Sequence, residues 1–444
     1  MKNLEISQEA FAGIVGWVRG HKVLALLLFF FALRVSVGLL AGQADPNVGD
    51  GQSYNSYARA ILNNPDWLTN PGFPGSARAP VYPVFLAFIY LIFGTNNVAV
   101  VYVIQAVLST LVLYFIFKLA LKIFNDKVAL IALVWAGFYY FYLKYVGFVL
   151  RETLEFFLMA AAFYYLFLFL TGGGRRVRNF GFTAVSFFLL SHTNPKYLLL
   201  LPLLLVLFLL YQPVWPGLKK YLLFLTVYLL LMVPWVIRNY IAYNGPVIIS
   251  SRLDFRGSEG LVKSSDFLTS SSFTNTVSQS VHQNVITRQE RELIKQGFNP
   301  RNRSAAEVDA VMRGVYPAAG FWERRLAMLI EFWRVTKFKG NFLPYPSARF
   351  EQWSLRHNLL NILCYGILIP FFLLAVYLLA RERHKYLLYL LFPIVFQAIL
   401  HTFIWSRERY RNPIDMFIII IGVYGLYSAL LLVKNFLKKR RWGI

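Results

Sequence analysis

A carboxylic acid opens a polar segment that lies between two hydrophobic stretches of the chain. Asp50 is followed by Tyr54 and Tyr57 at helical spacing, and a second acid, Glu152, stands at the start of a later hydrophobic stretch. A carboxylate in a partly desolvated pocket can accept a proton from a substrate hydroxyl. These two acids are therefore the candidate catalytic residues, and Asp50 is the candidate general base.

Basic and aromatic residues stand near the ends of other hydrophobic stretches. Guanidinium groups match phosphate oxygens in a bidentate geometry. The candidate phosphate-binding residues are Arg78, Arg151, Lys196, Arg238, Arg409 and Arg411, and the candidate substrate contacts are Tyr54, Tyr57, Tyr82, His192 and Glu408. Together they indicate a pocket that holds an anionic lipid headgroup and moves a proton.

Each candidate also has a structural interpretation. Asp50 is a favourable residue for capping the helix that it starts. Arg151 and Glu155 are four apart and form a possible structural ion pair, which leaves Glu152 free beside them. Arg78 has a stem long enough to reach lipid headgroups. Because these groups are all expected on one face of the membrane, we favour a shared substrate-binding pocket over separate structural roles.

The composition indicates a membrane protein. Hydrophobic residues make up 57% of the 444 residues, charged residues only 15%, and the mean hydropathy is +0.52. The formal charge of +24 is then explained by cytoplasmic loops and anionic headgroups rather than by nucleic acid. We expect an all-α polytopic protein.

The hydrophobic runs predict about ten transmembrane helices. They cover residues 23–41, 97–117, 128–148, 152–170, 180–193, 197–211, 221–241, 355–380, 386–404 and 413–433. Residues 81–93 are also apolar, but a helix of this length is too short to cross the hydrocarbon core, so we expect it to lie in the interface or to re-enter.

Charge asymmetry predicts the orientation of these spans. With residues 81–93 left out, the basic clusters fall on one side, which the positive-inside rule assigns to the cytoplasm together with both termini. The clusters are Arg19 and Lys22; Lys118, Lys122 and Lys127; Arg175, Arg176 and Arg178; Lys219 and Lys220; Arg381, Arg383 and Lys385; and Lys434, Lys438, Lys439, Arg440 and Arg441. The candidate site then faces the extracytoplasmic side of what we expect to be a bacterial inner membrane.

Three regions follow from this topology. Residues 1–241 form an N-terminal transmembrane module that includes the catalytic first loop, 43–96. Residues 242–352 form an extracytoplasmic loop, in which residues 304–337 have the spacing of a helical cap. Residues 353–444 form a C-terminal transmembrane module.

Several chemistries are not supported by the motifs. The glycines at 172–174 precede two arginines rather than the Gly-Lys-Ser/Thr of a phosphate loop. The six histidines are scattered without metal-ligand spacing, Cys364 is the single cysteine, and no Gly-x-Ser-x-Gly elbow occurs. A protein-only metal cage is not predicted, although a divalent metal remains possible.

Six short motifs, in order along the chain, resemble those of the GT-C glycosyltransferases, the group that includes protein O-mannosyltransferases and aminoarabinose transferases. They lie at residues 50–62, 78–94, 151–153, 190–195, 234–240 and 408–413. Two positions depart from the family pattern: Gly51 stands where a second acid is frequent, and Asn194 where many relatives have Arg. The first departure puts a metal-binding acid pair in doubt, and Lys196 is a candidate to replace the missing charge.

The resemblance implies transfer of a sugar from a polyprenyl-phosphate donor, in the bacterial case undecaprenyl phosphate, to a hydroxyl of a glycan, lipid or protein acceptor on the extracytoplasmic side. Asp50 would take the acceptor proton, the cations would neutralise the departing phosphate, and the sugar would invert. Two alternatives stay open. A lipid-linked oligosaccharide polymerase or ligase would use a diphosphate donor. A transporter or flippase would need charged residues deep in its spans, for which Arg34 and Glu155 are the main candidates.

Overall fold

A computed structural model gives the fold of the chain. It describes residues 21–42, 50–64, 78–95, 97–172, 174–243, 248–249, 321–336, 355–403 and 408–441. Within these ranges every regular element is helical and no strand occurs, which confirms the predicted all-α class.

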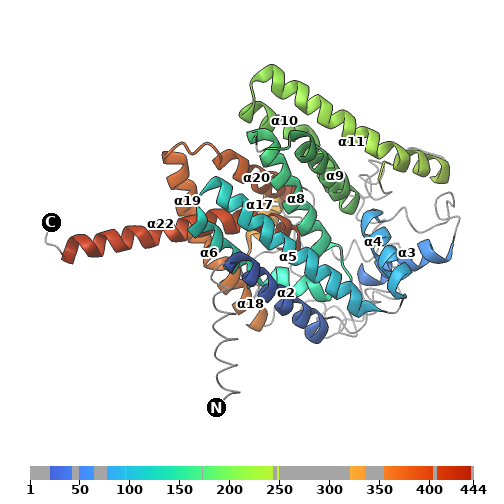
Figure 1. Cartoon of the computed structure of the whole chain (residues 1–444), viewed down its shortest axis with the longest axis horizontal. Helices are drawn as coiled ribbons and strands as arrows, with labels where there is room; N and C mark the ends of the chain where they lie inside the picture. The colour runs from blue at the N-terminus through green and yellow to red at the C-terminus, as the bar shows by residue number, and fades with distance from the viewer. Residues whose placement is uncertain are drawn as a thin grey trace, which may run out of the picture.

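The helices follow the hydrophobic runs of the sequence (Figure 1). They are α2 (Lys22–Ala41), α3 (Asp50–Asn63), α4 (Val81–Phe93), α5 (Val98–Ile123), α6 (Asp126–Gly137), α7 (Tyr140–Lys144), η3 (Tyr145–Gly147), α8 (Glu152–Thr171), α9 (Arg176–Thr193), η4 (Pro195–Leu199), α10 (Leu200–Tyr211), α11 (Val214–Tyr243), α17 (Phe321–Trp333), α18 (Leu355–Asn361), η9 (Ile362–Gly366), α19 (Leu368–Arg381), α20 (Leu387–Phe403), α21 (Glu408–Arg411), η10 (Asn412–Ile414) and α22 (Asp415–Arg441).

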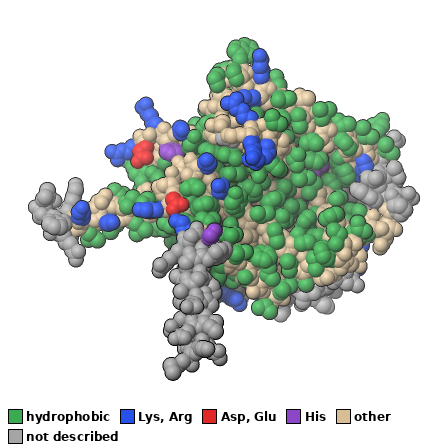
Figure 2. Space-filling model, in the orientation of Figure 1, with side chains coloured by type: hydrophobic (Ala, Val, Ile, Leu, Met, Phe, Trp, Pro, Cys, Tyr) green, Lys and Arg blue, Asp and Glu red, His purple; other side chains and the backbone are tan. Residues whose placement is uncertain are grey.

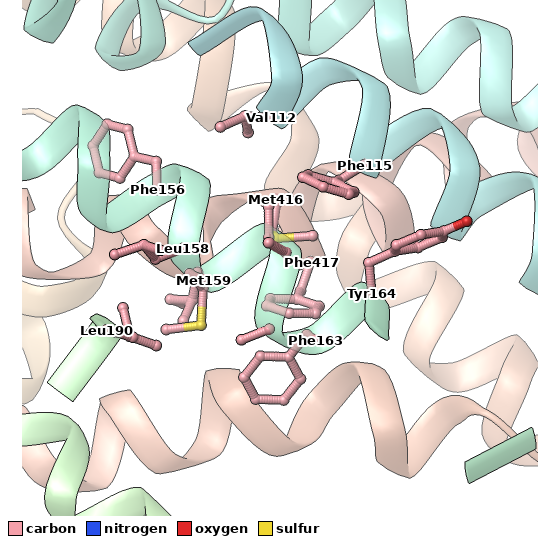
Figure 3. Packing of buried hydrophobic residues seen from close by; sticks show 14 of the residues in the cluster. Val112, Phe115, Phe156, Leu158, Met159, Phe163, Tyr164, Leu190, Met416 and Phe417 are labelled. Carbon is pink, nitrogen blue, oxygen red and sulfur yellow. The ribbon is translucent and has the colours of Figure 1, made fainter. Parts of the chain in front are cut away.

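Helix α8 lies at the centre of the bundle, because it is apolar on every side and must be covered all round. It packs against α5 and α9, and large side chains interlock around it (Figure 3). The Phe163 ring meets that of Phe417 edge to face, with centroids 5.2 Å apart, and Phe115 of α5 lies 5.3 Å from Tyr164. This core fixes the first turn of α8, where two acids stand.

Six described helices are long and apolar enough to cross a membrane, or seven if a bent pair counts as one span. These six agree with spans predicted from the sequence. The predicted span at 128–148 is instead broken into α6 and a short second helix that meet at 52°. Three further apolar helices are shorter: Val81–Phe93, Pro195–Tyr211 and Leu387–Phe403. The count of ten therefore remains a prediction.

Arg34 satisfies the backbone at this break. Its guanidinium is fully buried and donates to the carbonyls of Ala136 and Gly137, where α6 ends, while its Nε donates to Ser109 Oγ at 2.9 Å. A buried carbonyl without a partner is costly in a membrane, so this arginine has a structural use. Its position gives no support to the transporter alternative.

The outer surface of the bundle is largely apolar. Figure 2 shows hydrophobic side chains over the middle of the molecule, with Lys and Arg gathered over the α10 and α11 end and along the free part of α22. Exposed Leu, Phe and Ile side chains on α2, α4, α11 and α22 are what a lipid-facing surface requires. The chain is a multi-pass membrane protein.

Helices α3 and α4 form a small layer beside one end of the bundle (Figure 1). In α3 the buried positions 51, 54, 55, 57 and 58 recur at helical spacing, so one face packs inward and the polar face stays outside. In α4, Tyr82 and Leu86 are fully buried while Phe88 and Leu91 are exposed. These two short helices bring residues 50 and 78 to the start of α8, where Glu152 stands.

In the predicted loop 242–352 the structure describes residues 242–243, 248–249 and 321–336, and the last of these ranges, which contains α17, lies within the predicted helical stretch. Helix α17 packs on α20, and Arg325 Nη1 donates to the carbonyl of Phe403 at 2.7 Å. The rest of the loop lies outside the described residues. The three predicted regions of the chain stay predictions.

Candidate active site

Asp50 carries the centre of the candidate site. Its Oδ1 accepts a hydrogen bond from Arg78 Nη2 at 2.8 Å, and its Oδ2 accepts one from Arg409 Nη1 at 3.1 Å. The acid starts α3, Arg78 lies three residues before α4, and Arg409 lies on α21. Three segments far apart in sequence therefore converge on one carboxylate.

The charges around Asp50 favour its ionised form. Burial opposes ionisation of the carboxyl, but the positive charges of Arg78 and Arg409 outweigh burial and hold the pKa of Asp50 well below its usual range. The Arg78 pKa is raised, because Tyr54 and Asp50 outweigh its own desolvation. In this state Asp50 is a charged acceptor whose two oxygens are both engaged, and it is a weak proton acceptor.

Glu152 lies against the same guanidinium. Its Oε1 is 3.9 Å from Arg409 Nη1, the nitrogen that also contacts Asp50. Its side chain is 8% exposed, and its Oε2 has no hydrogen-bond partner. A buried, unsatisfied carboxylate oxygen is costly unless another group reaches it, so Glu152 Oε2 is available to accept a hydrogen bond.

The segment before α8 is held by polar side chains of the bundle. Gln105 Nε2 donates to the carbonyls of Val146 and Phe148 at 2.9 and 2.8 Å, and its Oε1 accepts from Tyr82 Oη at 3.0 Å. Thr153 Oγ1 donates to the carbonyl of Tyr145 at 3.0 Å. These bonds fix the chain on both sides of Arg151 and Glu152, the site residues at the start of α8.

A second charged cluster lies one turn further along α8. Glu155 Oε1 is 3.2 Å from Lys196 Nζ and accepts from Tyr197 Oη at 2.6 Å, while Oε2 is 3.7 Å from Arg151 Nε. The side chains of Glu155 and Lys196 are only 4% and 10% exposed. The Arg151–Glu155 ion pair agrees with the structural interpretation of that spacing.

Asn194 also binds this cluster. Its Nδ2 donates to both oxygens of Glu155 at 3.2 Å. The neutral amide therefore stabilises the acid at a position where an arginine would have added a charge, and Lys196 supplies the charge from two residues away. Tyr410 links the two clusters, because Lys196 Nζ lies 5.4 Å from its ring centre and Arg409 precedes it.

The predicted tyrosines line the inner side of the α3–α4 layer. The Tyr54 and Tyr82 rings meet edge to face, with centroids 4.9 Å apart, and the Arg78 guanidinium lies 5.1 Å from the Tyr54 ring centre. Tyr57 is buried on the same helix. These rings orient Arg78, and their role as substrate contacts stays a prediction.

Arg411 stands apart from the cluster around Asp50. Its side chain is fully buried, its Nε donates to Asp415 Oδ1 at 3.0 Å, and it stacks 3.5 Å from the ring centre of Tyr365. Its Nη1 donates to the carbonyls of Phe332 and Arg334, at the end of α17. This arrangement leaves no exposed surface for a phosphate, so we assign Arg411 a structural part.

The contacts described for Arg238 and His192 are made within their own helices, α11 and α9. Arg238 is buried, donates to Asn239 Oδ1 at 3.0 Å and lies over the Trp235 ring. His192 is buried in the last turn of α9, where its Nδ1 lies 2.9 Å from the carbonyl of Phe188. The side chain of Glu408 lies outside the described residues.

The described residues contain no group of three or more His, Cys, Asp or Glu side chains able to hold a metal ion. Both oxygens of Asp50 face guanidinium groups, and Gly51 follows where a second acid would stand. These residues, as arranged here, do not fit a divalent cation.

Sequence reasoning did not include Asn194, Tyr197 or Tyr410 among the candidate site residues, although Asn194 and Tyr410 lie within two of the six motifs. Tyr197 and Tyr410 each adjoin a predicted cation, Lys196 and Arg409. An aromatic residue next to a basic one at a span end was the available signal. Their contacts with Glu155 and Lys196 depend on tertiary packing.

Comparisons with known proteins find a family-model match over part of the chain and similar folds over nearly all of it. Residues 77–237 match the model of the dolichyl-phosphate-mannose-protein mannosyltransferase family. This range includes Arg78, Arg151, Glu152 and Lys196, and it lies within the stretch over which the sequence resembled GT-C enzymes. No curated protein matches the chain in sequence.

Solved structures of the Archaeoglobus fulgidus oligosaccharyltransferase are similar in fold. The apo form aligns with a TM-score of 0.54 at 15% identity over 96% of this chain and 52% of that one. The complex of that enzyme, AglB, with an inhibitory peptide and a dolichol-phosphate gives 0.54 at 13% identity over 96% and 52%. The form tethered to an acceptor peptide gives 0.56 at 13% over 95% and 51%. The chain thus spans about half the length of these proteins.

Proposed function

Because the chain has the fold of the GT-C membrane glycosyltransferases, we propose that it transfers a sugar from a polyprenyl-phosphate donor to an acceptor hydroxyl. The observation that carries this proposal is the Asp50 carboxylate held between Arg78 and Arg409. One acid and two guanidiniums are the groups that such a reaction needs: a proton acceptor and a clamp for the departing phosphate.

The reaction is a single displacement. The acceptor oxygen attacks the anomeric carbon of the sugar, and the bond between that carbon and the lipid phosphate oxygen breaks. The hydroxyl proton goes to Asp50, and the polyprenyl phosphate leaves with both electrons of the broken bond. Attack from the face opposite the phosphate inverts the anomeric configuration.

The two arginines link donor binding to the basicity of Asp50. In the free protein they hold the pKa of this carboxyl low, which makes it a poor base. A donor phosphate offers the same guanidiniums a group with greater negative charge and bidentate geometry. When Arg78 and Arg409 turn toward that phosphate, the pKa of Asp50 rises and the carboxylate becomes able to take a proton.

The neighbouring residues divide the remaining tasks. The free oxygen of Glu152 accepts a hydroxyl of the sugar or of the acceptor. Lys196 and Arg151 contribute positive charge from the neighbouring cluster, although Glu155 balances part of that charge. Arg238 and His192 remain candidates for contacts with the distal part of the substrates.

We further propose that the site opens on the extracytoplasmic side of a bacterial inner membrane. The positive-inside rule assigns the basic ends of α5, α11 and α19 to the cytoplasm. Asp50 and Arg409 stand at the opposite helix ends. Both termini then lie in the cytoplasm, and the acceptor enters from outside.

The experiment is a transfer assay with the purified protein in lipid. Polyprenyl-monophosphate sugars and polyprenyl-diphosphate glycans are supplied in parallel with membrane extract as acceptor, and mass spectrometry detects the product and the released lipid. The proposal expects turnover only with monophosphate donors. Turnover only with diphosphate donors would establish the polymerase or ligase alternative, and lipid movement without a covalent product would establish the transporter alternative.

A further inference from the structure

A cavity of about 540 Å³ lies at the far end of α8 from Asp50. Its lining comes from the end of α8, the start of α9, the end of α10 and the turn just before α20. Glu152 begins α8 and Thr171 ends it, so about 30 Å of helix separates the cavity from the candidate active site. That length matches the hydrocarbon core of a bilayer.

The described residues that line the cavity include two cations and no acid. Arg176 and Lys385 contribute positive side chains. Lys220 donates to Gln212 Oε1, another lining residue, and its charge interacts with that of Arg176. Two cations on α9 and α11 and a third in the turn before α20 gather here, and the described lining residues include no acid to neutralise them. Such an arrangement attracts a phosphate.

The geometry of the lining residues is fixed by hydrogen bonds. Gln212 Nε2 donates to the carbonyl of Leu170, and Tyr211 Oη donates to the carbonyl of Lys385 at 2.8 Å. The Tyr211 and Tyr386 rings stack with centroids 6.0 Å apart. Gly172 has φ of +78°, a left-handed conformation that lets α8 end beside the cavity.

The surroundings of the cavity fit a lipid better than a soluble ion. Leu170 and Leu210 give it an apolar wall. Nearby on α11, Val214 and Trp215 are 66% and 72% exposed, as expected for side chains at the depth of lipid headgroups. A cationic pocket with an apolar wall at this depth accommodates a phosphate together with the start of its acyl chains.

We propose that this cavity binds the phosphate headgroup of an anionic membrane lipid. The site is separate from the one that carries the proposed glycosyl transfer, and it uses none of the residues of that site. By the same positive-inside argument it lies in the cytoplasmic leaflet. The bound lipid would contact residues near the ends of α8, α9, α10 and α20 and so stabilise their packing.

The test measures, by native mass spectrometry, how tightly the purified full-length protein in neutral detergent binds three probes. The probes are short-chain phosphatidylglycerol, short-chain phosphatidylcholine and inorganic phosphate. The double variant Arg176→Gln/Lys385→Gln loses two charge-assisted contacts, so we expect about tenfold weaker binding of phosphatidylglycerol. The matched control is Lys122→Gln/Lys127→Gln, which removes the same charge from exposed positions outside the cavity.

The proposal holds if phosphatidylglycerol binds more tightly than phosphatidylcholine and only the cavity variant weakens it. Equal weakening by the control, equal affinity for both lipids, or binding of inorganic phosphate without a preference for the lipid would each overturn it. If the double variant misfolds, Lys385→Glu alone is used, because Lys385 is exposed. A normal transfer assay with failed lipid binding would reject this site and leave the proposed function standing.

Discussion

Arg409 Nη1 lies 3.1 Å from Asp50 Oδ2, although 359 positions separate the two residues in sequence. The same nitrogen is 3.9 Å from Glu152. One guanidinium of the C-terminal part of the chain therefore bridges two acids of the N-terminal part. The proposed site exists only when α21 is seated against α3 and α8.

Replacement of Asp50 by Asn is expected to abolish transfer while the protein stays folded. The amide keeps the size of the side chain but cannot take the acceptor proton, so the rate should fall by about 10²- to 10⁴-fold. The measurement is product formation at saturating donor, with donor binding followed separately. Donor binding should persist, since the two arginines remain.

Asp126→Asn is the matched control. This acid is exposed and pairs with Lys22 at 3.2 Å, at the opposite end of the bundle. Its variant should transfer at the normal rate. Near-normal transfer by the Asp50 variant would remove this residue from the mechanism.

Replacement of Arg409 and of Arg411 by Gln should have opposite consequences. Arg409→Gln should lower kcat by at least about tenfold with little change in unfolding temperature, because its guanidinium would stabilise the leaving phosphate. Arg411→Gln should instead destabilise the protein by about 3–5 kcal/mol, since Asp415 would be left buried without its cation. Unfolding in detergent and steady-state kinetics separate the two. A stable but inactive Arg411 variant would show that this residue acts in transfer and not in stability.

The pH dependence of transfer tests the exchange of arginines between Asp50 and phosphate. The pKa of Asp50 is depressed in the free protein, so protonation of this group should cause no loss of kcat/KM above about pH 4. In the donor complex the phosphate draws the two arginines away, so the acid limb of kcat should lie at a higher pH than that of kcat/KM. Arg78→Gln removes one cation and should move an acid limb of kcat/KM upward. Identical profiles for kcat and kcat/KM in the wild type would contradict the exchange.

The same shift predicts how stability depends on pH. A carboxyl with a lowered folded pKa stabilises the protein above its unfolded pKa, and this contribution is lost as the pH falls toward the folded value. The stability difference between wild type and Asp50→Asn should therefore be largest near neutral pH and should shrink below about pH 4. Unfolding midpoints measured across pH give this difference. A constant difference would indicate that Asp50 contributes by packing alone.

Glu155→Gln should destabilise the protein, because Lys196 would keep a buried charge without its acid. The expected loss is about 3–5 kcal/mol, and the double variant Glu155→Gln/Lys196→Met should recover part of it by removing the unpaired charge. Unfolding of the single and double variants measures the coupling. Simple addition of the two single losses would show that this pair does not act as a unit.

The sequence predicted the helical class, the membrane setting and most of the helices, because long apolar runs have few other stable forms in lipid. It also predicted the Arg151–Glu155 pair, since residues four apart on a helix are neighbours. The break of the 128–148 span was not predicted. Composition does not reveal where Arg34, from another helix, satisfies backbone groups freed by a bend.

The sequence by itself determined which residue types stand at the ends of the helices, and so which chemistry the chain can offer. Only the tertiary structure decided that Arg409 reaches Asp50 while Arg411, two residues away, turns to Asp415. The reason is geometric: residues two apart on a helical turn point in different directions. Which of two arginines meets the acid therefore depends on how α21 packs between α3 and α17.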